Sequence, residues 1–328
     1  MSSSPNSEVS LSMRAVVQNR FGSPDVLEVV RVPRPVPLPT EVLVRVHASG
    51  INPVDWESRA GGGMAGVLGR PPFTLGWDVS GVIEELGFGV TTFAVGDEVY
   101  GMPWFPRAAS AYAEFVTAPA RQFAHKPLTL THAEAAAVPL AALTAWQVLV
   151  DTAKVNTGQR VLIHAAAGGV GHFAVQLAKH LGATVIGTAS SRHHEWLRSI
   201  GADELIDYTT TQFESELSDV DVVVDLVGDQ HDTSVRSLSV LRPGGLLVAV
   251  PSGVSPALSA AAQAHEVRVS PFLVEPDGAG LQAIATIIDQ GGLSVDVQHV
   301  YPLAEVADAH RAGETDRTRG KLVLDLTK

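Results

Sequence analysis

One stretch of the chain, residues 160–179, constrains its fold more than any other. It reads RVLIHAAAGGVGHFAVQLAK: a short apolar strand, a run of small residues, then a helix. The helix is indicated by Val170, Phe173, Ala174 and Leu177, which recur at the spacing of one helical face. Strand, glycine turn and helix together are the opening of a dinucleotide-binding βαβ unit.

The small residues of this turn have a physical reason. Free backbone N–H groups and the helix dipole favour a pyrophosphate at the first turn of a helix, where side chains would obstruct it. We therefore expect a cofactor to contact Ala167, Gly168, Gly169, Val170 and Gly171. The usual first glycine of the motif is absent, and a purely structural turn is the alternative interpretation. A second strand at 184–187 favours the dinucleotide site.

The remaining chain shows two patterns. Residues 13–125 hold short strand-like runs punctuated by Gly and Pro, typical of a partly open barrel. Residues 160–270 alternate strands and helices, which predicts a doubly wound parallel sheet of Rossmann type, with Gly244 and Gly245 ending a helix. A strand over 321–326 is expected to rejoin the barrel. The fold class is thus α/β, with a dinucleotide-binding domain over residues 138–275 and a β-rich catalytic domain over 1–137 and 276–328.

Composition excludes several classes of protein. The chain has no cysteine, which rules out disulfides and thiolate zinc sites and favours a cytoplasmic location. No apolar run reaches the roughly 18 residues that a membrane span needs. The net charge of −12, without a basic cluster, argues against binding to nucleic acid or to a membrane surface.

Several short segments outside the glycine turn follow one another in a recognisable order. They are Met13–Val16, Ala48–Asp55, Gly76–Val82, Val95–Val99, Pro139–Ala145, Gly201–Asp203 and Gly320–Leu324. In this order the chain resembles the medium-chain dehydrogenase/reductase superfamily, and within it the zinc-free quinone oxidoreductases. The resemblance covers nearly everything from Met13 to Leu326. It implies a GroES-like β-rich domain, an active site in the cleft between two domains, and hydride transfer from a nicotinamide to a quinone or an α,β-unsaturated carbonyl. It also implies an oligomer, which we expect to be a homodimer.

Zinc divides this superfamily. In its zinc-dependent alcohol dehydrogenases a Cys and the His of a Gly-His-Glu segment are ligands, whereas the corresponding places here are Ile51-Asn52-Pro53 and Gly76-Trp77-Asp78. A catalytic zinc needs three protein ligands, and Trp77 cannot be one. We therefore expect no metal site. An electrophilic quinone or enone does not require a Lewis acid, whereas alcohol oxidation would lose its usual one.

The choice between NAD and NADP rests on the end of the second strand. NAD sites place an Asp or Glu about 20 residues beyond the glycine motif, on the ribose 2′-hydroxyl. Here Ser190, Ser191 and Arg192 follow the strand instead, and their hydroxyls and guanidinium suit a 2′-phosphate. Ser190 could equally cap the next helix. We predict NADP(H). By resemblance Tyr208 lies beside that phosphate, with a solvent-edge tyrosine as the alternative.

The nicotinamide end rests on the resemblance, which implies that Asn52 and Thr144 flank the ring as the catalytic residues. Asn52 could instead be a turn residue before Pro53, and Thr144 a hydroxyl bonded to its own helix. Strand ends are expected to line the cofactor, and two basic residues to approach its phosphates. These residues are Val227, Gly228, Ser252, Phe272, Leu273, Val274, Arg319 and Lys321.

A proton donor is not evident, because Trp56 and Glu57 occupy the place where some quinone reductases have a tyrosine. Asp55 is better explained as a structural hydrogen-bonding residue than as a general acid. Four aromatic residues could line a substrate pocket or belong to the core: Trp56, Trp77, Trp104 and Phe105. Two other functions stay open, an enoyl-thioester reductase and a non-catalytic NADPH-binding protein.

Overall fold

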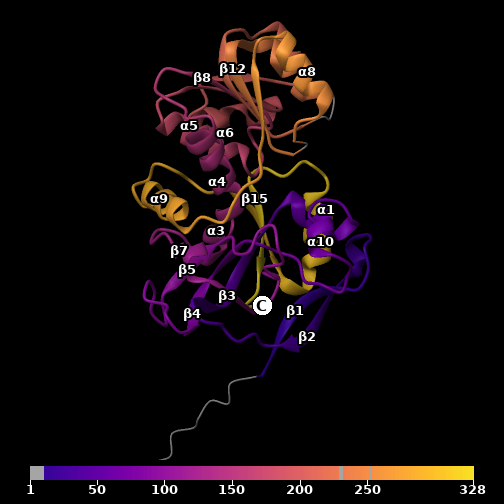
Figure 1. Cartoon of the computed structure of the whole chain (residues 1–328), viewed down its shortest axis with the longest axis vertical. Coiled ribbons are helices and arrows are strands. Elements are labelled where there is room, and N and C mark those ends of the chain that lie inside the picture. The colour runs from indigo at the N-terminus through magenta and orange to yellow at the C-terminus, as the bar shows by residue number, and fades with distance from the viewer. Residues whose placement is uncertain (1–10, 229–231, 252) are drawn as a thin grey trace, which may run out of the picture.

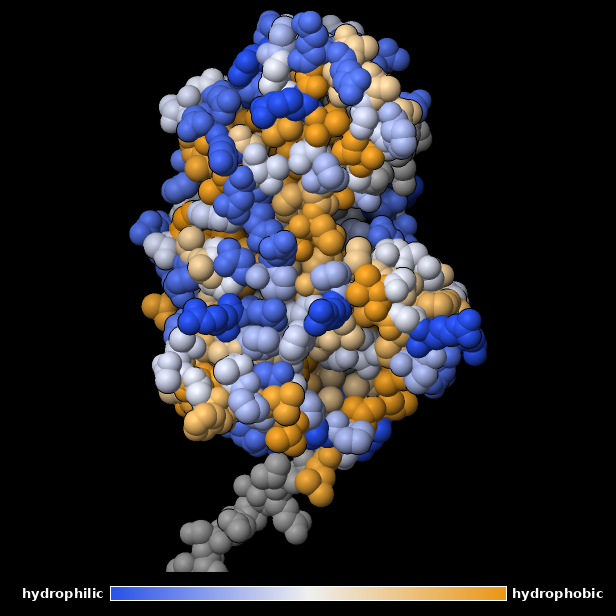
Figure 2. Space-filling model, in the orientation of Figure 1, coloured by the Kyte–Doolittle hydropathy of each residue, from blue (hydrophilic) through white to orange (hydrophobic). Residues whose placement is uncertain are grey.

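The computed structural model describes residues 11–228, 232–251 and 253–328. Figure 1 shows two lobes, one built on a parallel sheet and the other on a larger, mostly antiparallel sheet. We call them the parallel-sheet lobe and the barrel lobe. Figure 2 shows polar groups over much of both lobes and a cluster of apolar groups in the narrow region between them.

The parallel-sheet lobe contains six strands in the order β10-β9-β8-β11-β12-β13. Chain order runs outward from β8 in both directions, so the predicted doubly wound fold is confirmed. The strands are nearly continuous runs of Val, Ile and Leu, as expected for a sheet covered on both faces. Their bounds are β8 (Arg160–Ile163), β9 (Thr184–Thr188), β10 (Glu204–Ile206), β11 (Val220–Asp225), β12 (Leu241–Ala249) and β13 (Arg268–Pro271).

Helices cover this sheet, and some are shorter than the pattern suggested. Between β10 and β11 the chain forms only a 3-10 turn, Phe213–Ser215, and between β11 and β12 it forms a short α7 and a 3-10 turn, Leu238–Val240. The α-helices of this region are α4 (Pro139–Trp146), α5 (Gly171–His180), α6 (His194–Ser199), α7 (Thr233–Ser237) and α8 (Pro256–Ala264). The next helix, α9 (Gly278–Asp289), lies beside the barrel lobe.

Gly244 and Gly245 do not end a helix, so that prediction was wrong. They lie inside β12, where the register with β11 shifts between the pairs Val220–Leu241 and Val222–Leu246. Gly244 has a φ of +75°, which suits glycine. A Cβ on Gly245 would lie 2.9 Å from the carbonyl oxygen of Arg242. The two glycines therefore form an irregularity at the start of a strand.

The barrel lobe contains a seven-stranded sheet and a two-stranded ribbon, β1-β2. The path β14-β15-β3-β4-β5-β7 joins six strands, and β6 pairs with β3. The last strand, β15, lies between β14 and β3, which confirms that the end of the chain rejoins the first domain. The bounds are β1 (Ser12–Gln18), β2 (Leu27–Pro33), β3 (Glu41–Ile51), β4 (Val79–Leu86), β5 (Glu98–Gly101), β6 (Phe115–Pro119), β7 (Phe123–His125), β14 (Val297–Pro302) and β15 (Lys321–Asp325).

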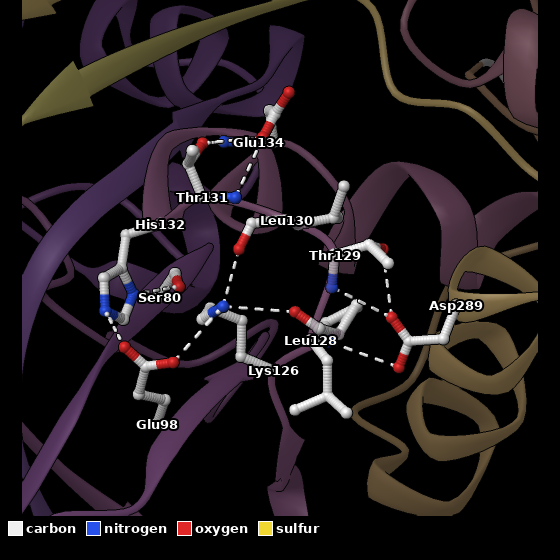
Figure 3. A network of polar contacts seen from close by, with 11 residues as sticks. Ser80, Glu98, Lys126, Leu128, Thr129, Leu130, Thr131, His132, Glu134 and Asp289 are labelled. Atoms are coloured by element: carbon white, nitrogen blue, oxygen red, sulfur yellow. Dashed lines mark hydrogen bonds and ion pairs between the residues drawn. The ribbon is translucent and has the colours of Figure 1, made fainter. Parts of the chain in front are cut away.

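Four further helices belong to or adjoin this lobe, α1 (Pro53–Ala60), α2 (Ala65–Leu68), α3 (His132–Ala136) and α10 (Val306–Gly313). A polar network holds the start of α3 against β5 and α9 (Figure 3). Glu98 contacts Lys126 at 3.3 Å and His132 at 3.2 Å. Asp289, at the end of α9, accepts a hydrogen bond from the backbone N–H of Thr129 at 3.1 Å. The network thus fixes the segment in which the chain leaves the barrel.

Candidate functional site

The glycine turn lies between β8 and α5, at the carboxyl end of the parallel sheet. A Cβ on Gly171 would lie 2.3 Å from the carbonyl oxygen of Ala165, so Gly171 is required for the close packing of helix and strand. A Cβ on Gly168 would meet only that same oxygen, at 3.2 Å, among the described atoms within 4 Å. Gly168 is half-exposed, so its missing side chain leaves room for a ligand. The turn therefore fits a bound pyrophosphate.

Basic residues from both lobes meet beside this turn. A cavity of about 370 Å³ brings Arg192, which follows β9, together with Arg319, which precedes β15. Arg319 pairs with Asp296 at 2.8 Å, and its guanidinium lies 4.9 Å from the ring centre of Trp196. The complete lining is Arg192, His193, Asp296, Val297, Gln298, Arg317 and Arg319. Arg317 was not anticipated from the sequence, although it lies two residues from Arg319.

The turn after β9 also contacts an acid that sequence reasoning missed. The backbone N–H of Ser191 donates to the carboxylate of Asp207 at 3.0 Å. Asp207 follows β10, which pairs with β9 in parallel and ends beside it. The residues directly after β9 include no acid, whereas the parallel pairing of β10 with β9 is the signal that brings Asp207 to this turn. The neighbouring Tyr208 is 63% exposed.

A buried cluster of charges and amides lies where the other end of the cofactor was expected. Lys321 donates to the carbonyl oxygen of Ile51 at 2.9 Å and to the side-chain oxygen of Asn52. The amide nitrogen of Asn52 donates to Asp78 at 2.8 Å, and Lys321 lies 3.7 Å from the same carboxylate. Asn52 is 1% exposed, so in this conformation its side chain is held by the cluster. The role of Asn52 beside the nicotinamide stays a prediction.

Lys321 connects this cluster to the glycine turn. Its side-chain methylene Cδ lies 3.0 Å from the place that a Cβ of Gly169 would occupy. The neighbouring Gly320 donates its N–H to the carbonyl oxygen of Ala167 at 3.0 Å. The ammonium group is thus directed at Asn52 and Asp78. Contact with the cofactor phosphates, which we expected of Lys321, remains a prediction.

Asp55 lies next to the cluster, and from the sequence a structural hydrogen-bonding role was favoured for it over that of a general acid. It is buried and accepts hydrogen bonds from the N–H groups of Asn52 at 2.8 Å and Gly76 at 3.1 Å. Burial, and to a smaller degree the nearby charge of Asp78, raise the pKa of Asp55 to about 7. The buried hydroxyl of Tyr112 lies beside it and has no well-directed hydrogen bond within the described chain. Asp55 is therefore a titratable group just behind the expected reaction site.

Comparison with known proteins agrees with this arrangement. A family model for alcohol dehydrogenase GroES-like domains matches residues 38–128, and one for zinc-binding dehydrogenases matches residues 200–324. A quinone oxidoreductase structure from Coxiella burnetii is 36% identical, covers 96% of this chain and 99% of that one, and superposes with a TM-score of 0.91. The chain belongs to the quinone oxidoreductase-like branch of the medium-chain dehydrogenase/reductase superfamily.

Three further members of the superfamily are informative. NAD(P)H oxidoreductase RTN4IP1, mitochondrial, from Danio rerio is 32% identical over 96% of this chain and 91% of its own length. A 2-haloacrylate reductase from a Burkholderia species is 36% identical over 94% and 98%. The quinone oxidoreductase of Escherichia coli, solved in complex with NADPH, is 30% identical over 95% and 99%, with a TM-score of 0.85.

Thr144, which was expected beside the nicotinamide ring, is buried in this protein. Its hydroxyl donates to the carbonyl oxygen of Leu140 at 2.7 Å, one turn earlier in α4. This is the hydrogen bond that a threonine hydroxyl inside a helix is expected to make with the backbone of the preceding turn. Leu140 in turn donates its N–H to Asp78 at 2.7 Å, so α4 is tied to the same cluster as Asn52.

The remaining residues expected at the cofactor lie at strand ends. Val227 and Gly228 follow β11, and both donate backbone N–H groups to Asp225, at 3.0 and 2.9 Å. Phe272 and Leu273 follow β13 and line a second cavity, of about 560 Å³, whereas Val274 is buried. Ser252 lies outside the described residues.

The aromatic residues divide into two groups. Trp77 and Phe105 are buried and pack edge to face at 5.4 Å, with the Trp77 indole donating to the carbonyl oxygen of Arg107 at 2.7 Å. These two belong to the core. Trp56 and Trp104 are half-buried, and for them a place in the substrate pocket remains the alternative to a place in the core.

Within the described ranges, no group of three His, Cys, Asp or Glu side chains is arranged to hold a metal ion. The same ranges contain no helix long and apolar enough to cross a membrane.

Proposed function

We propose that the protein is an NADPH-dependent reductase that transfers a hydride to a quinone or an α,β-unsaturated carbonyl without zinc. The observation that carries the proposal is the open space at Gly168 together with the cations of the Arg192–Arg319 cavity, which Gly320, the neighbour of Arg319, links to the turn through its hydrogen bond to Ala167. A dinucleotide phosphate needs both a side-chain-free helix terminus and nearby cations. Relatives named as quinone oxidoreductase and 2-haloacrylate reductase support an electrophilic acceptor.

The chain's own residues divide the work in this proposal. The backbone of 167–171 approaches the pyrophosphate, and Ser190, Ser191, Arg192 and Tyr208 surround the 2′-phosphate. Arg319 approaches the phosphates from the barrel lobe, and Val227, Gly228, Phe272, Leu273 and Val274 line the dinucleotide. We expect Lys321 to lie near the phosphates as well, although in this conformation its ammonium group is held by Asn52 and Asp78. Bound NADPH supplies the hydride. Asn52 and Thr144 hold the reacting end, so the rate arises mainly from proximity and orientation.

Activity should depend on NADPH and be independent of a metal. Oxidation of NADPH by a simple benzoquinone, followed by nicotinamide absorbance, is expected to proceed at the same rate before and after prolonged dialysis against EDTA. The reason is that a quinone is already electrophilic and the chain has no cysteine to hold zinc. A panel with an alkenal and an enoyl thioester identifies the acceptor class. NADPH binding without turnover of any acceptor would leave the non-catalytic alternative, and stoichiometric zinc lost together with activity would overturn metal independence.

Arg192→Ala should remove most of the cofactor preference. Arg192 lines the basic cavity and is exposed, so its loss removes a cation without disturbing the core. We expect wild type to bind NADPH at least about tenfold more tightly than NADH, equivalent to about 1.4 kcal/mol, and the variant to bind the two nearly equally. Fluorescence titration of both cofactors measures this. Arg198→Ala, on the exposed end of α6, is the control and should change neither affinity. Equal affinities in wild type would refute the NADPH preference.

Three broader predictions accompany the function. The domain boundaries 138–275, and 1–137 with 276–328, are supported by the sheets, because every strand of each sheet comes from its own set of residues. A homodimer is supported by β13, whose outer edge pairs with no described strand. A cytoplasmic location is supported by the absence of cysteine, although one relative is named as mitochondrial. We expect no nucleic-acid or membrane partner.

A further inference from the structure

Asp207 is held in a defined position beside the expected 2′-phosphate site. One oxygen of its carboxylate accepts hydrogen bonds from the hydroxyl and the backbone N–H of Thr209, at 2.6 and 3.0 Å. The other oxygen accepts from the backbone N–H of Ser191 at 3.0 Å. Hydrogen bonds from Thr209, with a smaller contribution from Ser191, hold the pKa of Asp207 well below its usual range. The carboxylate is therefore ionised at neutral pH.

The pairing of two strands brings this charge to the turn. Ile206 of β10 lies opposite Thr188 of β9, so the residues that follow them leave the sheet side by side. Ala189 donates its N–H to the carbonyl oxygen of Ile206 at 3.1 Å and continues the ladder by one step. Asp207 then faces Ser191 across the gap between the two strand ends. An acid thus stands next to the cofactor-selecting turn, although it comes from the third strand of the sheet instead of the second.

The chemistry of this carboxylate opposes that of the basic cavity. A ribose 2′-hydroxyl can donate to a carboxylate, which is how many NAD sites recognise it. A 2′-phosphate carries negative charge on its oxygens, so a carboxylate beside its site would repel it. Asp207 also occupies the Ser191 N–H, a donor that a phosphate oxygen would otherwise use. Arg192, Arg317 and Arg319 act in the opposite direction.

We propose that Asp207 is a specificity-determining residue that weakens NADPH binding and supports NADH binding, so that the enzyme accepts both cofactors. The inference rests on the proposed function, because it requires the dinucleotide to lie along the glycine turn. The arginines of the basic cavity then favour NADPH over NADH, and Asp207 makes this preference smaller. A relative named as an NAD(P)H oxidoreductase is compatible with such a balance.

Asp207→Asn tests the proposal. The asparagine oxygen can still accept from Thr209, so the local turn is kept, while the charge is lost and the Ser191 N–H is released. Dissociation constants for NADPH and NADH, from fluorescence titration of the whole protein, are the readout. We expect the ratio of NADPH to NADH affinity to rise about tenfold, with tighter NADPH binding and weaker NADH binding.

Asp203→Asn is the matched control, because Asp203 precedes the same strand at its opposite end and pairs with Lys179 at 2.6 Å. It changes the net charge equally and should leave the ratio unchanged. NADPH binding that stays the same or weakens in Asp207→Asn would overturn the proposal, since Asp207 would then serve only to hold the turn. Failure of wild type to bind either cofactor would instead refute the proposed function. Asp207→Ser provides a second variant if the amide misfolds.

Discussion

Gly168→Val is expected to abolish NADPH binding in a protein that remains folded. The added Cβ would meet only the carbonyl oxygen of Ala165, at 3.2 Å, so a small adjustment can accommodate it within the protein. The two methyl groups would extend into the space that we assign to the pyrophosphate and hold it away from the helix terminus. We expect NADPH affinity to fall at least about a hundredfold, or about 2.7 kcal/mol, with little change in melting temperature.

Gly171→Val is the matched control for this experiment. Its Cβ would lie 2.3 Å from the carbonyl oxygen of Ala165 and 2.8 Å from the backbone of Ala166, so helix α5 would have to move away from β8. This variant should lose stability as well as binding. Calorimetry and NADPH titration on both variants separate the two effects. A folded Gly168→Val protein that binds NADPH normally would show that the cofactor lies elsewhere.

Lys321→Met should destabilise the protein by about 3–5 kcal/mol, because it leaves Asp78 charged and buried without its cation. Lys321 is 3% exposed and Asp78 is 0% exposed, and their charged groups are 3.7 Å apart. The same substitution removes the hydrogen bond that Asn52 accepts from Lys321. Urea denaturation of the purified variant measures the free energy of unfolding.

Two variants place this result in context. Lys179→Met breaks the exposed pair with Asp203 and should cost less than about 1 kcal/mol, because water solvates both charges. Lys321→Met combined with Asp78→Asn removes both buried charges and should recover much of the stability. If Lys321→Met leaves the free energy of unfolding unchanged, the carboxyl of Asp78 is protonated in the native protein.

The parallel-sheet lobe was predictable because its signals are local. The glycine turn, the apolar strands and their alternation with helices each occupy a few consecutive residues, and the doubly wound type of sheet followed from them. Contacts between distant segments were not predictable in the same way. Lys321 pairs with Asn52, 269 positions away, and with Asp78, which is also distant in the chain, and nothing in the spacing of these residues indicates the pairing.

Two errors have a common physical origin. Gly244 and Gly245 look like a helix end, but the partner strand β11 fixes them in β12 with a shifted register. Asp207 was not predicted at this site because it is distant in sequence from the turn after β9. A parallel sheet brings the ends of different strands together, and here it places Asp207 at that turn. In both places a neighbouring strand decides the outcome, and single-segment patterns do not contain that information.

The position of β15 determines the order in which the two lobes can fold during translation. The parallel sheet is formed from one unbroken stretch, Arg160 to Pro271, and can be completed as soon as that stretch has emerged. The barrel sheet cannot, because β3 pairs with β15, which follows every other described strand in the chain. The edge of β3 that pairs with β15 therefore stays unpaired while the intervening chain is translated. A chain that terminates early, before Lys321, would carry a finished cofactor-binding lobe attached to a permanently incomplete, aggregation-prone one.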